Sequence, residues 1–190
     1  GAALTGGSWT VNPSGFLSFA GTSLVALGAD ATVRVSGALF SFDSLTSLAS
    51  NAGTLELFGG RDLLTTATFV NTGEIILGAG SDLTVGTFTQ TSAGTVEFGI
   101  SGAGAGQQGK LVGTAAATLG GTARAKVVGG FDPQAGQSFP LMSFTSRTGT
   151  FAKVEGLNIG QADVFEAVYT NTAFSLNSLV SAADLDVETI

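Results

Sequence analysis

The chain has 190 residues, a length that suits one domain. It contains no cysteine and no histidine, which excludes disulfides, a Cys/His zinc site, a cysteine nucleophile and a Ser-His-Asp triad. Seven basic against fourteen acidic residues give a net charge of −7, which argues against binding to nucleic acid. With 44% hydrophobic and 11% charged residues, the sequence is too apolar for a disordered segment.

The N-terminal part predicts short strands, because apolar and polar residues alternate there. Residues 8–11 and 16–19 are interpreted as an irregular first turn of a repeat, and residues 32–35 as the first regular strand. Helix signals are almost absent. The best candidate, residues 43–51, is short and rich in serine, and predicts a single helical turn over one end or corner.

A repeat of about 20 residues follows, in which glycine, apolar and aspartate positions recur in register. The line from Gly53 to Leu63 recurs from Gly73 to Leu83, and Gly94 opens a third line. Alternation within the lines assigns these residues to one buried face: Val33, Val35, Leu55, Leu57, Ile75, Leu77, Val96 and Phe98. Two or three short strands per period are typical of a β-solenoid. A β-sandwich also has many short strands, but it does not require this self-similarity.

The period is lost after Gly99. Residues 101–109 predict a glycine-rich loop, and the strands expected beyond it are separated by wider turns, which favours larger or partly antiparallel coils. A solenoid needs its open end covered, and residues 162–179 are interpreted as part of a cap. The predicted organisation is β-solenoid coils over 1–100, the loop over 101–109, larger coils and an irregular C-terminal cap over 110–180, and an acidic tail over 181–190.

Three segments, residues 109–123, 130–142 and 149–151, resemble the C-terminal passenger pattern of bacterial autotransporter-like β-helix surface proteins. Residues 73–98 resemble the short repeats of the same proteins, so the resemblance covers roughly residues 45 to 175. It implies an all-β fold, an exported right-handed parallel β-helix stalk that is often adhesive. The route of export and anchoring stays open.

Residues 104–110 match the G-x-x-x-x-G-K pattern of a phosphate-binding loop. Such a loop works because a helix begins directly after it and directs backbone N–H groups at the phosphate. Here Leu111 replaces the required Ser or Thr, and the following residues predict a strand. We therefore expect an exposed loop without a nucleotide site.

Two pairs of carboxylates are candidate sites. Asp62 and Asp82 hold equivalent turn positions one coil apart, where they are the candidates for calcium; the alternative is that each caps its own turn. Glu56 and Glu97 lie on one outer face with Ile76 between them, so ~9–10 Å separates their backbones, a spacing that an inverting glycosidase allows. No aromatic platform for a sugar accompanies them, so we expect no catalytic residues.

A threonine array is the last candidate, because several threonines between residues 65 and 91 resemble the flat face of an ice-binding solenoid. A one-residue slip between Phe69 and Phe88 is expected to spoil its register. Taken together, the sequence predicts a non-catalytic structural or adhesive module of a secreted or surface-displayed bacterial protein. It would need no metal and no cofactor, would not insert into a membrane, and would bind copies of itself end to end or a surface glycan or protein. The alternative is a carbohydrate-binding or carbohydrate-cleaving β-helix.

Overall fold

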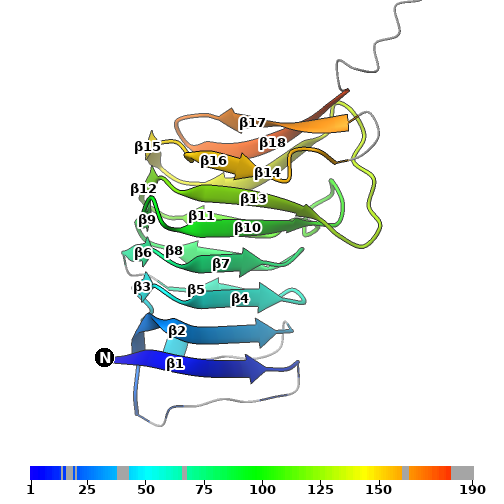
Figure 1. Ribbon diagram of the computed structural model, residues 1–190. Coiled ribbons are helices and arrows are strands. Elements are labelled where there is room, and N and C mark those ends of the chain that lie inside the picture. Colours follow the sequence, from blue (N-terminus) through cyan, green and yellow to red (C-terminus); the bar gives the residue numbers. More distant parts are fainter. Residues whose placement is uncertain are drawn as a thin grey trace, which may run out of the picture.

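The chain is a β-solenoid of about five turns, in which parallel strands stack coil upon coil (Figure 1). This computed structural model describes residues 1–13, 15, 19, 21–37, 43–65, 68–159 and 163–180. Within these residues the only helix is a 3-10 turn, η1 (Asp43–Leu45), which confirms the expected single turn near the start of the repeat. The acidic tail, residues 181–190, lies outside the described residues.

Each regular coil contributes one strand to each of three faces. Face 1 consists of β3 (Ser50–Asn51), β6 (Phe69–Asn71), β9 (Phe88–Gln90), β12 (Ala116–Leu119) and β15 (Ser146–Gly149). Face 2 consists of β4 (Thr54–Phe58), β7 (Glu74–Leu77), β10 (Thr95–Ile100), β13 (Thr122–Val127) and β16 (Lys153–Glu155). Face 3 consists of β5 (Leu63–Leu64), β8 (Asp82–Val85), β11 (Lys110–Gly113) and β14 (Ser138–Ser143).

The first two coils each contribute one longer strand, β1 (Ala2–Val11) and β2 (Leu24–Ser36), and the two strands stack in parallel. The first half of β2 pairs with β3 and its second half with β4, so that β2 joins faces 1 and 2 into one sheet. β1 runs parallel to β2 with two register shifts, between Ala2 and Ala3 and between Leu4 and Gly6, whereas residues 8–11, expected to be irregular, pair with β2 in continuous register. Residues 16–18 of the second expected strand lie outside the described residues.

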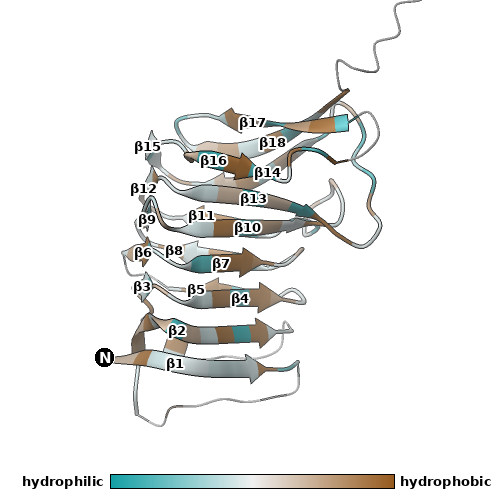
Figure 2. Ribbon diagram, viewed as in Figure 1, coloured by the Kyte–Doolittle hydropathy of each residue, from teal (hydrophilic) through white to brown (hydrophobic). Residues whose placement is uncertain are grey.

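Period-two alternation produces the core, because inward residues of successive coils stack in register. One column runs Val33, Leu55, Ile75, Val96 and a second runs Val35, Leu57, Leu77, Phe98. All eight side chains are buried, which confirms the predicted inner face. Figure 2 shows the same alternation along β2, where apolar and polar residues succeed one another.

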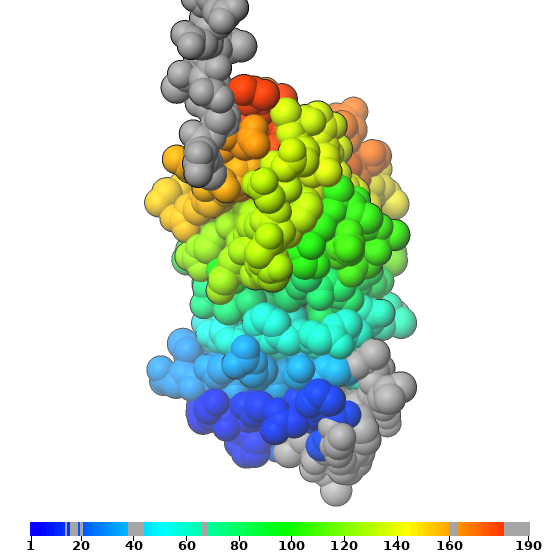
Figure 3. Space-filling view, turned by 90° about the vertical axis from the view of Figure 1, so that its right-hand side faces the viewer, coloured from blue at the N-terminus to red at the C-terminus, as the bar shows by residue number. Residues whose placement is uncertain are grey.

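The coils continue past the point where the sequence period is lost. Thr54 pairs with Glu74, and Glu74 with Thr95, spacings of 20 and 21 residues. Thr95 then pairs with Thr122, and Thr122 with Lys153, spacings of 27 and 31 residues. The extra residues lie at the corner between faces 2 and 3, onto which Figure 3 looks. These later coils are larger, as expected, and still parallel.

Among the described strands, antiparallel pairing occurs in the C-terminal hairpin of β17 (Asp163–Tyr169) and β18 (Ala173–Val180) and between β18 and β14. Outside the strands, single antiparallel bridges join Ile100 to Gln108 and Asn158 to Val164. Phe174 in β18 is fully buried, and its ring centroid lies 6.4 Å from that of Phe98 and 5.0 Å from that of Phe151. The hairpin therefore sends apolar side chains into the interior at the upper end of the stack (Figure 1).

A ladder of buried amides also crosses the coils on face 1. Asn51 donates from Nδ2 to Oδ1 of Asn71 at 2.9 Å, and Asn71 donates to Oε1 of Gln90 at 3.2 Å. Gln90 in turn donates to the backbone carbonyl oxygens of Gly94, Gly120 and Thr122. This ladder is not among the features predicted from the sequence, and its one sequence signal is the recurrence of Asn-x-Gly at 51–53 and 71–73.

Candidate functional site

The outer surface of face 2 carries a row of mostly charged residues. The row includes Glu56 and Glu97, the carboxylate pair that the sequence predicts, together with other charged residues. The row, in register from coil to coil, consists of Arg34, Glu56, Ile76, Glu97, Arg124 and Glu155. This row places Glu56 and Glu97 two coils apart with Ile76 between them, as the sequence predicted. Each of the two carboxylates is held in an ion pair, since Arg34 Nε lies 3.0 Å from Glu56 and Arg124 Nη1 lies 3.3 Å from Glu97.

Arg124 is the centre of an ionic cluster that spans four coils. Its guanidinium lies 3.1 Å from Glu74, 3.3 Å from Glu97 and 3.0 Å from Glu155. The hydrogen bonds to these carboxylates, the one to Glu155 first, raise the pKa of Arg124. Lys153 and Arg124 in turn lower the pKa of Glu155. Glu97 is also paired with Lys126, whose Nζ lies 3.4 Å from Oε1.

A hollow of about 230 Å³ opens beside this cluster. Phe58, Gly78, Gly99 and Lys126 occupy the same position in four successive rungs, and the two glycines leave the surface without side chains between the ring and the lysine. Ile76 and Val128 contribute further apolar surface, and Glu97 lies at the rim. Sequence reasoning missed this hollow, because only the register places the two glycines side by side.

The aspartate pair adopts an arrangement that neither sequence interpretation described. Oδ1 of Asp62 accepts a hydrogen bond from the backbone N–H of Asp82 at 3.0 Å, so Asp62 caps the next coil and not its own turn. Burial, and secondarily the charge of Asp62, raise the pKa of Asp82. In the register of strands β8 and β11, Lys110 lies opposite Asp82 in the following rung. Within the described residues, no group of three or more His, Cys, Asp or Glu side chains is arranged to hold a metal ion.

The glycine-rich loop is part of the corner between faces 2 and 3. Lys110 begins strand β11, where a phosphate-binding loop would require a helix. The expectation that residues 101–109 are all exposed is wrong for Gly102, Gln108 and Gly109, which are buried. Gln108 folds inward because its Nε2 donates to the carbonyl oxygens of Gly102 and Gly104, which closes the loop on itself.

The threonine array is in register in part. Phe69 and Phe88 are register partners, so the expected one-residue slip between them is wrong. The 19-residue spacing is accommodated at a corner, which leaves the strand register unchanged. Thr89, Thr118 and Thr148 are aligned in three successive rungs of face 1, and the hydroxyl oxygens of Thr118 and Thr148 lie 3.1 Å apart, but Val70 interrupts the row. Thr89 lies between Val70 and Thr118, and Thr65 is buried, with Oγ1 donating to the carbonyl oxygen of Leu48. Residues 66 and 67 lie outside the described residues.

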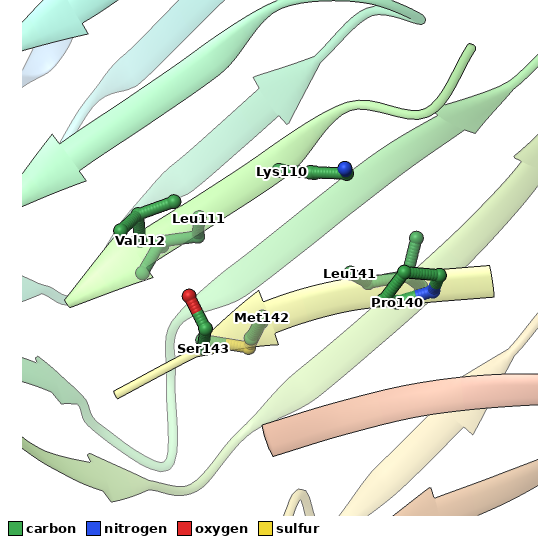
Figure 4. A pocket seen from close by; sticks show the side chains of 7 residues that line it. All are labelled: Lys110, Leu111, Val112, Pro140, Leu141, Met142 and Ser143. Carbon is green, nitrogen blue, oxygen red and sulfur yellow. The ribbon is translucent and has the colours of Figure 1, made fainter. Parts of the chain in front are cut away.

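A second hollow, of about 250 Å³, lies on face 3 between β11 and β14 (Figure 4). The two strands pair only at Leu111 with Met142 and at Val112 with Ser143. Pro140 has no N–H to donate, and β14 carries a bulge between Pro140 and Met142 in its pairing with β18. The opening follows from this local loss of pairing, and Lys110 is the one charged residue among the described residues that line it.

No protein-family model, no curated protein and no solved structure matches this chain. The class of the protein, a β-solenoid, therefore rests on the stacked coils themselves. No helix in the described part of the chain is long and apolar enough to cross a membrane.

Proposed function

We propose that this chain is a non-catalytic structural or adhesive module of a secreted or surface-displayed bacterial protein, of the autotransporter passenger type. The observation that carries the proposal is the continuity of the stack. One apolar core runs through the described coils, and amide and ionic ladders join successive coils from that of β4 to that of β16. Repeats that contact only their neighbours form an elongated body whose flat faces are exposed, a shape suited to a stalk that presents surfaces for attachment.

The resemblance of residues 45–175 to passenger repeats supports the same role and an extracellular or cell-surface location. The partners we propose are a surface glycan or protein, or further copies of the chain joined end to end. No step of chemistry is assigned to Glu56 or Glu97, because both carboxylates are engaged in ion pairs with arginines.

The test is adhesion. Beads coated with the folded chain are expected to bind to surfaces bearing bacterial or host glycans and proteins, and beads coated with the heat-unfolded chain are not. Analytical ultracentrifugation of the same chain measures end-to-end association. Equal binding of the folded and unfolded chains, together with a strictly monomeric chain at all concentrations, would contradict the proposal.

A further inference from the structure

We infer that the hollow on face 2, between Phe58 and Lys126, is a binding site for a single neutral sugar ring. The inference names a ligand for the attachment role and in that respect rests on the proposed function. It is carried by the shape of the hollow, by its apolar walls and by the charge balance of its rim.

The shape comes from two adjacent glycines. A Cβ at Gly78 would lie 2.5 Å from Cδ1 of Phe58, so the ring lies over Gly78. A Cβ at Gly99 would lie 2.7 Å from the backbone nitrogen of Ala79, so the floor between the two rungs is bare backbone. At both positions this close contact leaves no room for a side chain, so the Phe58 ring, the bare backbone of residues 78–79 and Lys126 bound the hollow. Its volume of about 230 Å³ is below that of a drug-sized site, which suits one ring.

The walls are apolar and the aromatic wall is held in place. The guanidinium carbon of Arg34 lies 4.5 Å from the ring centroid of Phe58, and Glu56 fixes Arg34 through an ion pair of 3.0 Å. Ile76 and Val128 add aliphatic surface. The C–H groups of a sugar ring have the apolar surface that packs against such walls, and a fixed ring does not lose rotamer freedom on binding.

The rim supplies donors and acceptors for hydroxyl groups. The side chain of Glu97 is 8% exposed, and its oxygens are oriented by Lys126 and Arg124. Each carboxylate oxygen has lone pairs beyond the one that an ion pair uses. The Lys126 side chain is 62% exposed, and its ammonium has three donors, of which Glu97 takes one. A hydroxyl group can donate to Glu97 while a neighbouring one accepts from Lys126.

Charge balance selects a neutral ligand. Glu74, Glu97 and Glu155 face Arg124, Lys126 and Lys153 in one connected cluster, so three negative charges meet three positive ones. The cluster offers an anionic ligand no cation beyond those already paired, and it offers a cationic ligand no carboxylate beyond those already paired. An apolar side chain of a partner would leave the donors and acceptors of the rim unused. A ring with C–H faces and hydroxyl edges uses both parts of the site.

The experiment follows backbone amide signals of the full chain by NMR during titration with methyl glycosides of one size. The neutral probes are methyl glucoside, methyl galactoside and methyl N-acetylglucosaminide, and the anionic probe is methyl galacturonide. We expect at least one neutral glycoside at millimolar concentration to shift the amide signals of Gly78, Ala79 and Gly99. Phe58→Leu and Lys126→Met are expected to weaken this binding about tenfold each.

Lys153→Met is the matched control, since it removes the same charge from the same face but does not line the hollow. It is expected to leave binding unchanged. Absence of shifts with every neutral glycoside, stronger shifts with methyl galacturonide, or unchanged binding in Lys126→Met would each overturn the inference. If glycosides do not bind but the coated beads still adhere, the sugar site is wrong and the attachment role stands. If both assays are negative, both proposals fail.

Discussion

Asn51 and Asn71 are fully buried, lie 20 residues apart and share a hydrogen bond from Nδ2 of the first to Oδ1 of the second at 2.9 Å. Asn71 passes the ladder on to Gln90, whereas Oδ1 of Asn51 receives no hydrogen bond. In the coil below, Leu27 occupies the equivalent position and has no donor to offer. The two asparagines are thus chemically identical but energetically unequal.

Replacing Asn71 with Leu should therefore destabilise the protein more than replacing Asn51 with Leu. Asn71→Leu leaves Oε1 of Gln90 and the carbonyl oxygen of Thr95 without the hydrogen bonds that Asn71 donates, which we expect to cost about 1–3 kcal/mol. Asn51→Leu likewise leaves Oδ1 of Asn71 and the carbonyl oxygen of Glu74 without the hydrogen bonds that Asn51 donates, but it also removes the unpaired Oδ1, so its cost should fall at the low end of about 1–3 kcal/mol. Urea denaturation of both variants measures the difference in their free energies of unfolding. Equal losses of stability would show that the unpaired Oδ1 of Asn51 does not make the two positions unequal.

Leu77→Ala tests the core column. Leu77 is fully buried between Leu57 and Phe98 in successive rungs, and the cavity left by the substitution should cost about 2–5 kcal/mol. Leu64→Ala is the control, since Leu64 is 56% exposed on face 3 and its truncation should change the stability by about 0.5 kcal/mol or less. Similar midpoints for the two variants in a denaturation experiment would argue against the register.

Arg124→Met tests the ionic cluster. Among the described residues, the substitution leaves the buried carboxylate of Glu97 with Lys126 as its only cationic partner. We expect a loss of about 1–2 kcal/mol, because solvent screens a side chain that is 37% exposed. Arg34→Met, which breaks one pair at a more exposed arginine, should cost about 0–1 kcal/mol. If Arg124→Met lowers the free energy of unfolding no more than Arg34→Met does, the cluster contributes no more to stability than one surface ion pair.

The same cluster predicts a loss of stability in acid. The pKa of Glu155 is lowered in the fold, by Lys153 first and then by Arg124, so its contribution is present above the ordinary pKa of a glutamate. That contribution is lost as the pH falls through the lowered pKa. Thermal melts of the wild type across this acidic range should show a steeper decline than those of Glu155→Gln. If the melting temperatures of the two proteins decline in parallel with pH, Glu155 does not contribute to the loss of stability in acid.

Asp82→Asn is expected to stabilise the protein slightly at neutral pH. Burial and Asp62 raise the pKa of Asp82, so the fold favours its protonated form, and stability falls as the pH rises through that raised pKa. The amide removes this cost, with a gain below about 1 kcal/mol at a partly exposed site that disappears in acid. A chelator should leave the melting temperature of the wild type unchanged. Stabilisation by calcium that Asp82→Asn abolishes would instead make the aspartate pair a metal site.

What the sequence by itself determined is the solenoid, since period-two alternation inside a period of about 20 residues requires an inward apolar column that only stacking can bury. The inner faces of Leu55, Leu77 and Phe98 followed directly from that pattern. Tertiary structure decided everything that depends on which residues meet between coils. After Gly99 the corners are longer, so the period of about 20 residues is no longer visible in the sequence although the strands keep their register. This is possible because a corner accommodates inserted residues, whereas an insertion within a paired strand would shift its register. Register also sets Gly78 beside Gly99 to open a hollow, and brings Arg124 to carboxylates up to 50 positions away in the chain. Such contacts leave no local pattern to read.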